Sequence, residues 1–143
     1  MSPASDDVRP GGDRPFRYGP AVEDHLARPR NPGPLAGATH VARGTNDACG
    51  DELVLYLVVR ADRIERAAFQ AKGCAPALAA GSITTELVCG LAVADALVLE
   101  AIAVERALGG LPRAKRHAAT LAIAVLRSAL AQKRLQPGPP LVS

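Results

Sequence analysis

Cys49 and Asp51 stand two residues apart, with Gly50 between them, directly before the most strand-like segment of the chain at 52–60. Thiolate and carboxylate groups both bind metal ions, and a glycine lets the backbone approach a bound ion closely. The stretch 46–51 is therefore predicted to be a loop that supplies half of a metal or cluster site. Other parts of the chain must supply the other half.

Two further side chains could complete such a site. Cys74 follows Lys72-Gly73, where a strand is expected to end and a helix to begin. A thiol at a helix N-terminus is expected to ionise below its reference pKa of about 8.5. His117 stands early in the last expected helix. Taken singly, such a Cys is often a small core residue and such a His a capping group, and the cysteines match no zinc-finger spacing.

The composition limits the class of protein. A chain of 143 residues with 22% charged and 48% apolar residues is expected to form one soluble globular domain. The net charge of +3 comes without a dense basic run or aromatic interleaving, so no nucleic-acid partner is predicted. The longest apolar stretch, 91–104, is interrupted by Asp95 and Glu100 and is too short to cross a membrane.

The cysteine count and the start of the chain favour a reducing compartment. Three cysteines is an odd number, and residues 1–20 are polar and rich in Pro and Gly, without the apolar run of a signal peptide. We therefore expect a cytoplasmic protein without a disulfide framework.

Prolines, glycines and apolar periodicity predict the order of the elements. The first half is expected to hold a disordered tail at 1–20, a short helix at 21–27, a loop at 30–37, a turn at 60–63, and strands at 39–45, 52–60 and 64–71. The second half is expected to hold a helix at 75–89, one or two short helices in 93–108, a long helix at 113–135 and a tail at 136–143. Strands followed by helices predict an α+β fold, a small three-stranded antiparallel sheet with helices packed on one face.

In addition, the sequence resembles the iron–sulfur cluster assembly scaffolds, the NifU N-terminal domain and IscU group. Six pieces match in order between about residues 22 and 132. They are Asp24-His25 with Pro29-Arg30-Asn31 and Gly33, then Ala48-Cys49-Gly50-Asp51, Lys72-Gly73-Cys74, Thr85-Glu86-Leu87, Ala107-Leu108-Gly109-Gly110-Leu111-Pro112, and Lys115 with His117. The resemblance places a scaffold domain at 21–135 and implies the SufE/NifU-like fold.

The resemblance also implies a function and a set of site residues. The protein would not be an enzyme but a platform that binds iron or a [2Fe-2S] cluster and passes it on. By position, the implied metal ligands are Cys49, Asp51, Cys74 and His117, and Lys115 is implied as a neighbour that pairs with Asp51 in the empty site. The implied partners are a cysteine desulfurase, an iron or electron donor, and cluster carriers or apo-acceptor proteins.

The chain departs from the family pattern at two places. The family has a third cysteine directly after the histidine, which usually receives sulfur, and this chain has Ala118 there. An alanine methyl can neither hold sulfur nor bind iron. Cys89 does not replace it, because in a continuous helix it would lie about 22 Å from Cys74, and it is expected to be a small packing residue. The stretch 111–115 also departs from the family's Leu-Pro-Pro-Val-Lys motif for a dedicated chaperone.

Three hypotheses follow. The first is a scaffold or scaffold-like carrier of iron–sulfur clusters. The second is a zinc-bound sulfur acceptor resembling the SufU group, in which Cys49 or Cys74 would take the sulfur, since four such ligands also close a tetrahedron around Zn²⁺. The third is a degenerate paralogue that acts only through protein partners.

Overall fold

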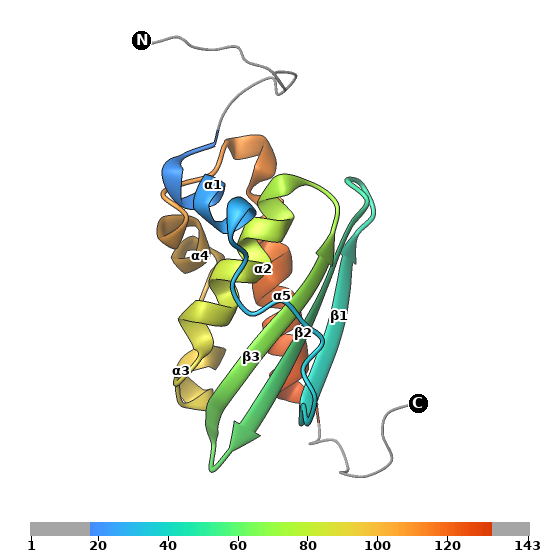
Figure 1. The fold of residues 1–143 in the computed structure, drawn as a ribbon, viewed down its shortest axis with the longest axis vertical. Coiled ribbons are helices and arrows are strands. Elements are labelled where there is room, and N and C mark those ends of the chain that lie inside the picture. The colour runs from blue at the N-terminus through green and yellow to red at the C-terminus, as the bar shows by residue number, and fades with distance from the viewer. Residues whose placement is uncertain (1–17, 133–143) are drawn as a thin grey trace, which may run out of the picture.

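The computed structural model describes residues 18–132, which form a three-stranded antiparallel sheet with helices on one of its faces (Figure 1). The strands, in the order β1-β2-β3, are β1 (His40–Asn46), β2 (Asp51–Arg60) and β3 (Arg63–Lys72). The helices are α1 (Pro20–Ala27), α2 (Ala75–Val88), α3 (Val93–Leu97), α4 (Ala101–Ala107) and α5 (His117–Ala131), with a short 3-10 turn at Arg113–Lys115. The predicted α+β class is confirmed. The tail predicted at 136–143 and most of the tail predicted at 1–20 lie outside the described residues.

β2 is the central strand, and its side chains alternate between the two faces of the sheet. Leu53, Leu55 and Leu57 point toward the helices and are buried, whereas the residues between them are half-buried. Because a strand has a side-chain period of two, Asp51 falls on the same face as these leucines. The first residue of β2 therefore places a carboxylate on the face that the helices cover.

The predicted turn at 60–63 is a tight hairpin between β2 and β3. Ala61 and Asp62 have φ angles of +54° and +62°, as two-residue type I′ turns require at both central positions. The hairpin, together with a one-residue β-bulge between Val58 and Val59, sets a register in which Glu52 at the start of β2 lies opposite Lys72 at the end of β3. The chain that follows β3 therefore enters α2 beside the start of β2.

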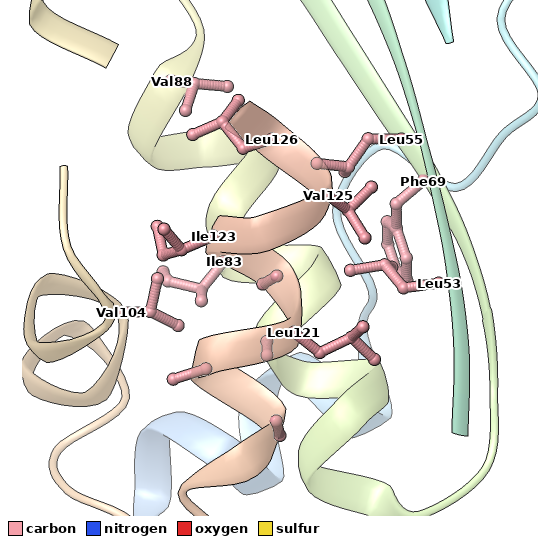
Figure 2. Packing of buried hydrophobic residues seen from close by; sticks show 14 of the residues in the cluster. Leu53, Leu55, Phe69, Ile83, Val88, Val104, Leu121, Ile123, Val125 and Leu126 are labelled. Atoms are coloured by element: carbon pink, nitrogen blue, oxygen red, sulfur yellow. The ribbon is translucent and has the colours of Figure 1, made fainter. Parts of the chain in front are cut away.

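α5 and α2 form the helical layer that closes the core. In Figure 2, Leu121 and Val125 of α5 point toward Leu53, Leu55 and Phe69 on the sheet, and all five are buried. The core is built almost entirely from aliphatic side chains and alanine.

α5 is shorter than predicted at both ends. Residues 113–115 form the 3-10 turn instead of the first helical turn, and α5 begins only at His117. It ends at Ala131 because Gln132 adopts an extended backbone, with φ −81° and ψ 159°. Within residues 18–132, none of the helices is both long and apolar enough to span a membrane.

α1 is held against α2 by buried polar contacts. The Nδ1 atom of His25 lies 2.6 Å from the Oγ atom of Ser82, and the backbone N–H of Arg30 donates to the same oxygen at 2.8 Å. The chain then runs along the free edge of β3, where Gly33 donates its N–H to the carbonyl of Phe69 at 2.7 Å. The N-terminal segment thus covers the edge of the sheet that lies farthest from β1.

The burial of His25 predicts a loss of stability at acidic pH. Burial, followed by the nearby charge of Arg30, lowers the pKa of His25 below its ordinary value of 6.5. Below that value the unfolded chain binds more protons than the folded chain, so the free energy of unfolding falls as the pH falls. Urea unfolding at pH 7.5 and pH 5.5, with a chelator present, should show a smaller pH-dependent loss in His25→Gln than in the wild type. Equal losses in the two proteins would contradict this role of His25.

Gly81 in α2 permits a close approach of this helix to the sheet. A methyl group at residue 81 would lie 2.6 Å from the ring of Phe69 and 2.9 Å from a methyl of Leu53. We expect Gly81→Ala to destabilise the fold by about 1–3 kcal/mol in urea unfolding, although alanine is favoured over glycine in helices by about 1 kcal/mol. Combined with Phe69→Leu, which makes room, the change should cost less than the sum of the single effects. A Gly81→Ala protein as stable as the wild type would show that the packing is not tight.

Candidate metal centre

Asp51 lies where three segments that are distant in the sequence meet: the β1–β2 turn, the start of α2 and the start of α5. These segments lie at the same end of the molecule, the upper end in Figure 1. The Oδ1 atom of Asp51 accepts the backbone N–H of Cys74 at 2.9 Å, and its Oδ2 atom lies 3.1 Å from the Nε2 atom of His117. A buried carboxylate is costly unless it is paired, and Asp51 is only 1% exposed, so these contacts fix its position.

Cys74 is the N-cap residue of α2 and is half-buried, with its Sγ atom 3.5 Å from the Oδ2 atom of Asp51. Burial raises the pKa of the Cys74 thiol; a backbone contact from Ala77 opposes this, and the charge of Asp51 adds to it. The prediction of a lowered pKa at this helix N-terminus is therefore wrong. The helix macrodipole is outweighed because the thiol is partly removed from water and faces a carboxylate.

His117 is the first residue of α5, and its ring is held from both sides. The Nδ1 atom lies 3.2 Å from the carbonyl oxygen of Ala114. Because a carbonyl can only accept a hydrogen bond, Nδ1 carries a proton in this contact, and Nε2 faces Asp51. Metal-binding histidines are commonly fixed in this way through their second ring nitrogen. Nε2 is therefore the ring nitrogen of His117 that is turned toward the other candidate ligands.

Cys49 lies in the turn between β1 and β2 and is exposed. One ligand atom each from Cys49, Asp51 and His117 lie within 4.8 Å of one another. Cys74 stands next to this group through its contact with Asp51. The structure thus groups three of the four residues that the sequence singled out, and the fourth, Cys74, lies outside that group but in contact with Asp51.

The spacing of the ligand atoms suits a metal ion. In a tetrahedral site, two oxygen or nitrogen ligands lie about 3.3 Å apart, and a thiolate and an oxygen lie about 3.5 Å apart. The corresponding distances here are 3.1 Å between Nε2 of His117 and Oδ2 of Asp51, and 3.5 Å between Sγ of Cys74 and the same oxygen. Two thiolates, one imidazole and one carboxylate also provide enough ligands for a small iron–sulfur cluster.

Three other predicted residues take different places. Lys115 was predicted to pair with Asp51, but Asp51 pairs with His117 in this structure. The charge of Lys115 weakly opposes the rise that burial causes in the pKa of Cys74. Cys89 is the C-cap residue of α2, at the helix end away from the site. It is exposed, so the prediction of a packing residue is wrong: the helix ends there, and its thiol reaches the carbonyl of Glu65 at 3.5 Å. Ala118 is buried in the hydrophobic core.

Sequence reasoning missed two groups that position the ligands: the backbone N–H of Cys74 and the carbonyl of Ala114. Every residue carries such groups except for the N–H of proline, so no residue type signals them. Only the local conformation, a turn before α2 and a 3-10 turn before α5, aims them at the site.

Comparison with known proteins gives the family. Residues 17–137 match the model of the NifU-like N terminal domain, which accounts for most of the chain. The chain belongs to this family. It is 42% identical over 113 residues to the iron–sulfur cluster assembly scaffold protein IscU 1 of Archaeoglobus fulgidus, covering 79% of this chain and 74% of that protein. It is 36% identical over 125 residues to the IscU scaffold of Aquifex aeolicus, covering 86% and 80%.

Solved structures share the fold. A candidate scaffold for the SUF system of Fervidobacterium islandicum superposes with a TM-score of 0.64 at 20% identity, covering 79% of this chain and 96% of that one. The N-terminal part of a NifU-like protein from Brucella abortus gives 0.64 at 21% identity, covering 78% and 90%. At such identities the likeness concerns the fold alone. The relatives at higher identity confirm the prediction of an IscU-like scaffold protein that is not an enzyme.

The geometry predicts which thiols a metal ion protects. We expect Zn²⁺ to slow the alkylation of Cys49 and Cys74, because both sulfurs would bind the ion, and to leave Cys89 unchanged. Without metal, Cys74 should react more slowly than Cys49 because it is half-buried and its pKa is raised. Digestion and mass spectrometry after timed alkylation measure all three, with Cys89 as the internal control. Protection of Cys89, or none of Cys49, would contradict the site.

Proposed function

We propose that this member of the NifU-like N-terminal domain family is a scaffold that binds iron or a [2Fe-2S] cluster and passes it to acceptor proteins. The ligands in this proposal are Cys49, Asp51, Cys74 and His117. The observation that supports it most directly is their convergence: three ligand atoms lie within 4.8 Å of one another, and the fourth ligand lies 3.5 Å from Asp51. The scaffold relatives support the same function.

Asp51 suits a site whose cargo must leave again. Carboxylate oxygen is a harder ligand than thiolate and binds iron in sulfide clusters less well. A site with Asp51 is therefore expected to release its cluster more readily than a site with four cysteines. The burial of Asp51 also keeps the carboxylate away from water until cargo arrives.

Sulfur must reach this site by a route other than the family's third cysteine. Ala118 is 1% exposed and carries no group that could accept sulfur. We propose a cysteine desulfurase as the sulfur source and cluster carriers or apo-acceptor proteins as recipients, in the cytoplasm expected from the cysteine count. Of the two ligand thiols, Cys49 is exposed and Cys74 is half-buried, so Cys49 is the one that such a partner can reach.

A zinc-binding sulfur acceptor like the SufU group is the second candidate. One observation favours it: Cys49, Asp51 and His117 each offer a ligand atom, and these three atoms are near enough to share one ion. Four such ligands form the closed tetrahedron typical of structural zinc.

Anaerobic reconstitution distinguishes these candidates. The protein is incubated with ferrous iron, sulfide and zinc, separately and together, and is then examined by metal analysis and visible absorption. We expect bound iron and sulfide with the absorption of a [2Fe-2S] cluster. Stoichiometric zinc without a cluster chromophore, even when iron and sulfide are in excess, would support the second candidate. A protein that binds neither metal would support a degenerate paralogue.

Single substitutions locate the bound group. Cys49→Ala and Cys74→Ala should lose the cluster, because each removes a thiolate ligand, whereas Cys89→Ala is the matched control and should keep it. Asp51→Cys should give a cluster that a chelator or an apo-acceptor protein removes more slowly. Equal cluster content in Cys49→Ala and Cys89→Ala would exclude Cys49 as a ligand.

A further inference from the structure

Gly73 stands between the end of β3 and the start of α2, and its backbone φ angle is +122°. Residues with side chains rarely adopt this conformation. A methyl group at residue 73 would lie 2.2 Å from the Oδ1 atom of Asp51 and 2.8 Å from its Cα atom. Because the second of these atoms belongs to the backbone, a side-chain rotation could not relieve the clash. The missing side chain of Gly73 is therefore what lets the start of β2 and the turn before α2 come together.

This close approach gives the two oxygens of Asp51 different partners. Oδ1 accepts the backbone N–H of Cys74 at 2.9 Å. Oδ2 faces the side chains of the other ligands, 3.1 Å from Nε2 of His117 and 3.5 Å from Sγ of Cys74. One oxygen of the carboxylate is thus tied to the backbone, and the other is turned toward the metal-binding groups.

We propose that Gly73 is a positioning residue that makes Asp51 a one-oxygen ligand. It allows the Cys74 N–H to engage Oδ1, which leaves Oδ2 alone for the metal ion or cluster. The inference rests on the proposed function of the site and adds the reason why its carboxylate binds in one mode. A carboxylate with one oxygen engaged by an N–H can bind a metal ion only through the other oxygen. It holds the ion less firmly than a carboxylate that binds through both oxygens. Gly73 therefore sets the mode in which Asp51 binds.

The effect of Gly73→Ala follows from this geometry. The added methyl forces the start of β2 away from the turn before α2, so Oδ1 loses the Cys74 N–H and Oδ2 is no longer held against His117. Loss of groups that orient metal ligands typically lowers metal affinity by about 10–100-fold. We expect a loss of this size, together with the loss of the carboxylate from the ligand set.

Titration with Co²⁺ under anaerobic conditions, followed by visible absorption, tests the proposal. Gly73→Ala should bind Co²⁺ about 10–100-fold more weakly than the wild type, with ligand-field bands like those of Asp51→Ala and with the thiolate charge-transfer bands retained. The variant that combines Gly73→Ala with Asp51→Ala should have a Co²⁺ affinity within about twofold of that of Asp51→Ala alone, because both changes remove the same ligand. Gly90→Ala is the matched control: its φ angle is +91°, but an added methyl meets no atom within 4 Å. It should bind like the wild type.

Two results would overturn the proposal: wild-type affinity and bands in Gly73→Ala, or single effects that simply multiply in the combined variant. They are distinct from failure of the proposed function, which would show as a wild-type protein whose Co²⁺ spectrum lacks thiolate charge-transfer bands.

Hydrogen exchange of the Cys74 amide tests the same proposal if Gly73→Ala does not fold. Asp51→Asn keeps a side-chain oxygen that can accept the N–H, whereas Asp51→Ala does not. We expect slow exchange in the wild type and in Asp51→Asn, and exchange about tenfold faster in Asp51→Ala. Equal exchange rates in the three proteins would show that Oδ1 is not engaged by Cys74, and the proposal would be wrong.

Discussion

The buried carboxylate of Asp51 is the interaction on which the ligand-bearing end of the molecule depends. It joins the first residue of the central strand to the start of α2, through the N–H of Cys74, and to the start of α5, through His117. A charged group with so little exposure is stable only if every oxygen has a partner. The fold must therefore bring partners to this carboxylate. Three features place the start of α2 beside it: the tight hairpin, the register of β2 with β3, and the glycine at residue 73.

The same contacts prepare the site for cargo. Nε2 of His117 and Oδ2 of Asp51 lie 3.1 Å apart, a distance that also fits two ligands of one ion. In the proposed function, a metal ion would be bound by both atoms with little movement of either side chain. The buried carboxylate would then have a partner both with and without a bound ion. This balance suits a protein that holds its cargo only for a time.

The sequence was most informative where a pattern has one physical cause. A nearly continuous apolar run at 53–59 predicted the strand β2, and the residues of the turn predicted the hairpin, because both signals are local. The ligand set came from the resemblance to the scaffold family. The pKa of Cys74 and the exposure of Cys89 were predicted wrongly, because each depends on which groups from other elements surround the thiol. The 3-10 turn before α5 was also missed, since a proline marks a helix entrance without fixing whether the first turn is α or 3-10.

The position of Ala118 explains how this chain can keep the fold and still lack the third cysteine. Successive residues of an α-helix point about 100° apart, so His117 can face Asp51 while the next side chain faces the core. Ala118 indeed belongs to the buried cluster beneath α5, where a small apolar residue packs without cost. The fold therefore requires no thiol there, and the start of α5 places a single candidate ligand, His117, beside Asp51. The two thiols near Asp51 then come from the β1–β2 turn and from the turn between β3 and α2, and only Cys49 on the β1–β2 turn is exposed.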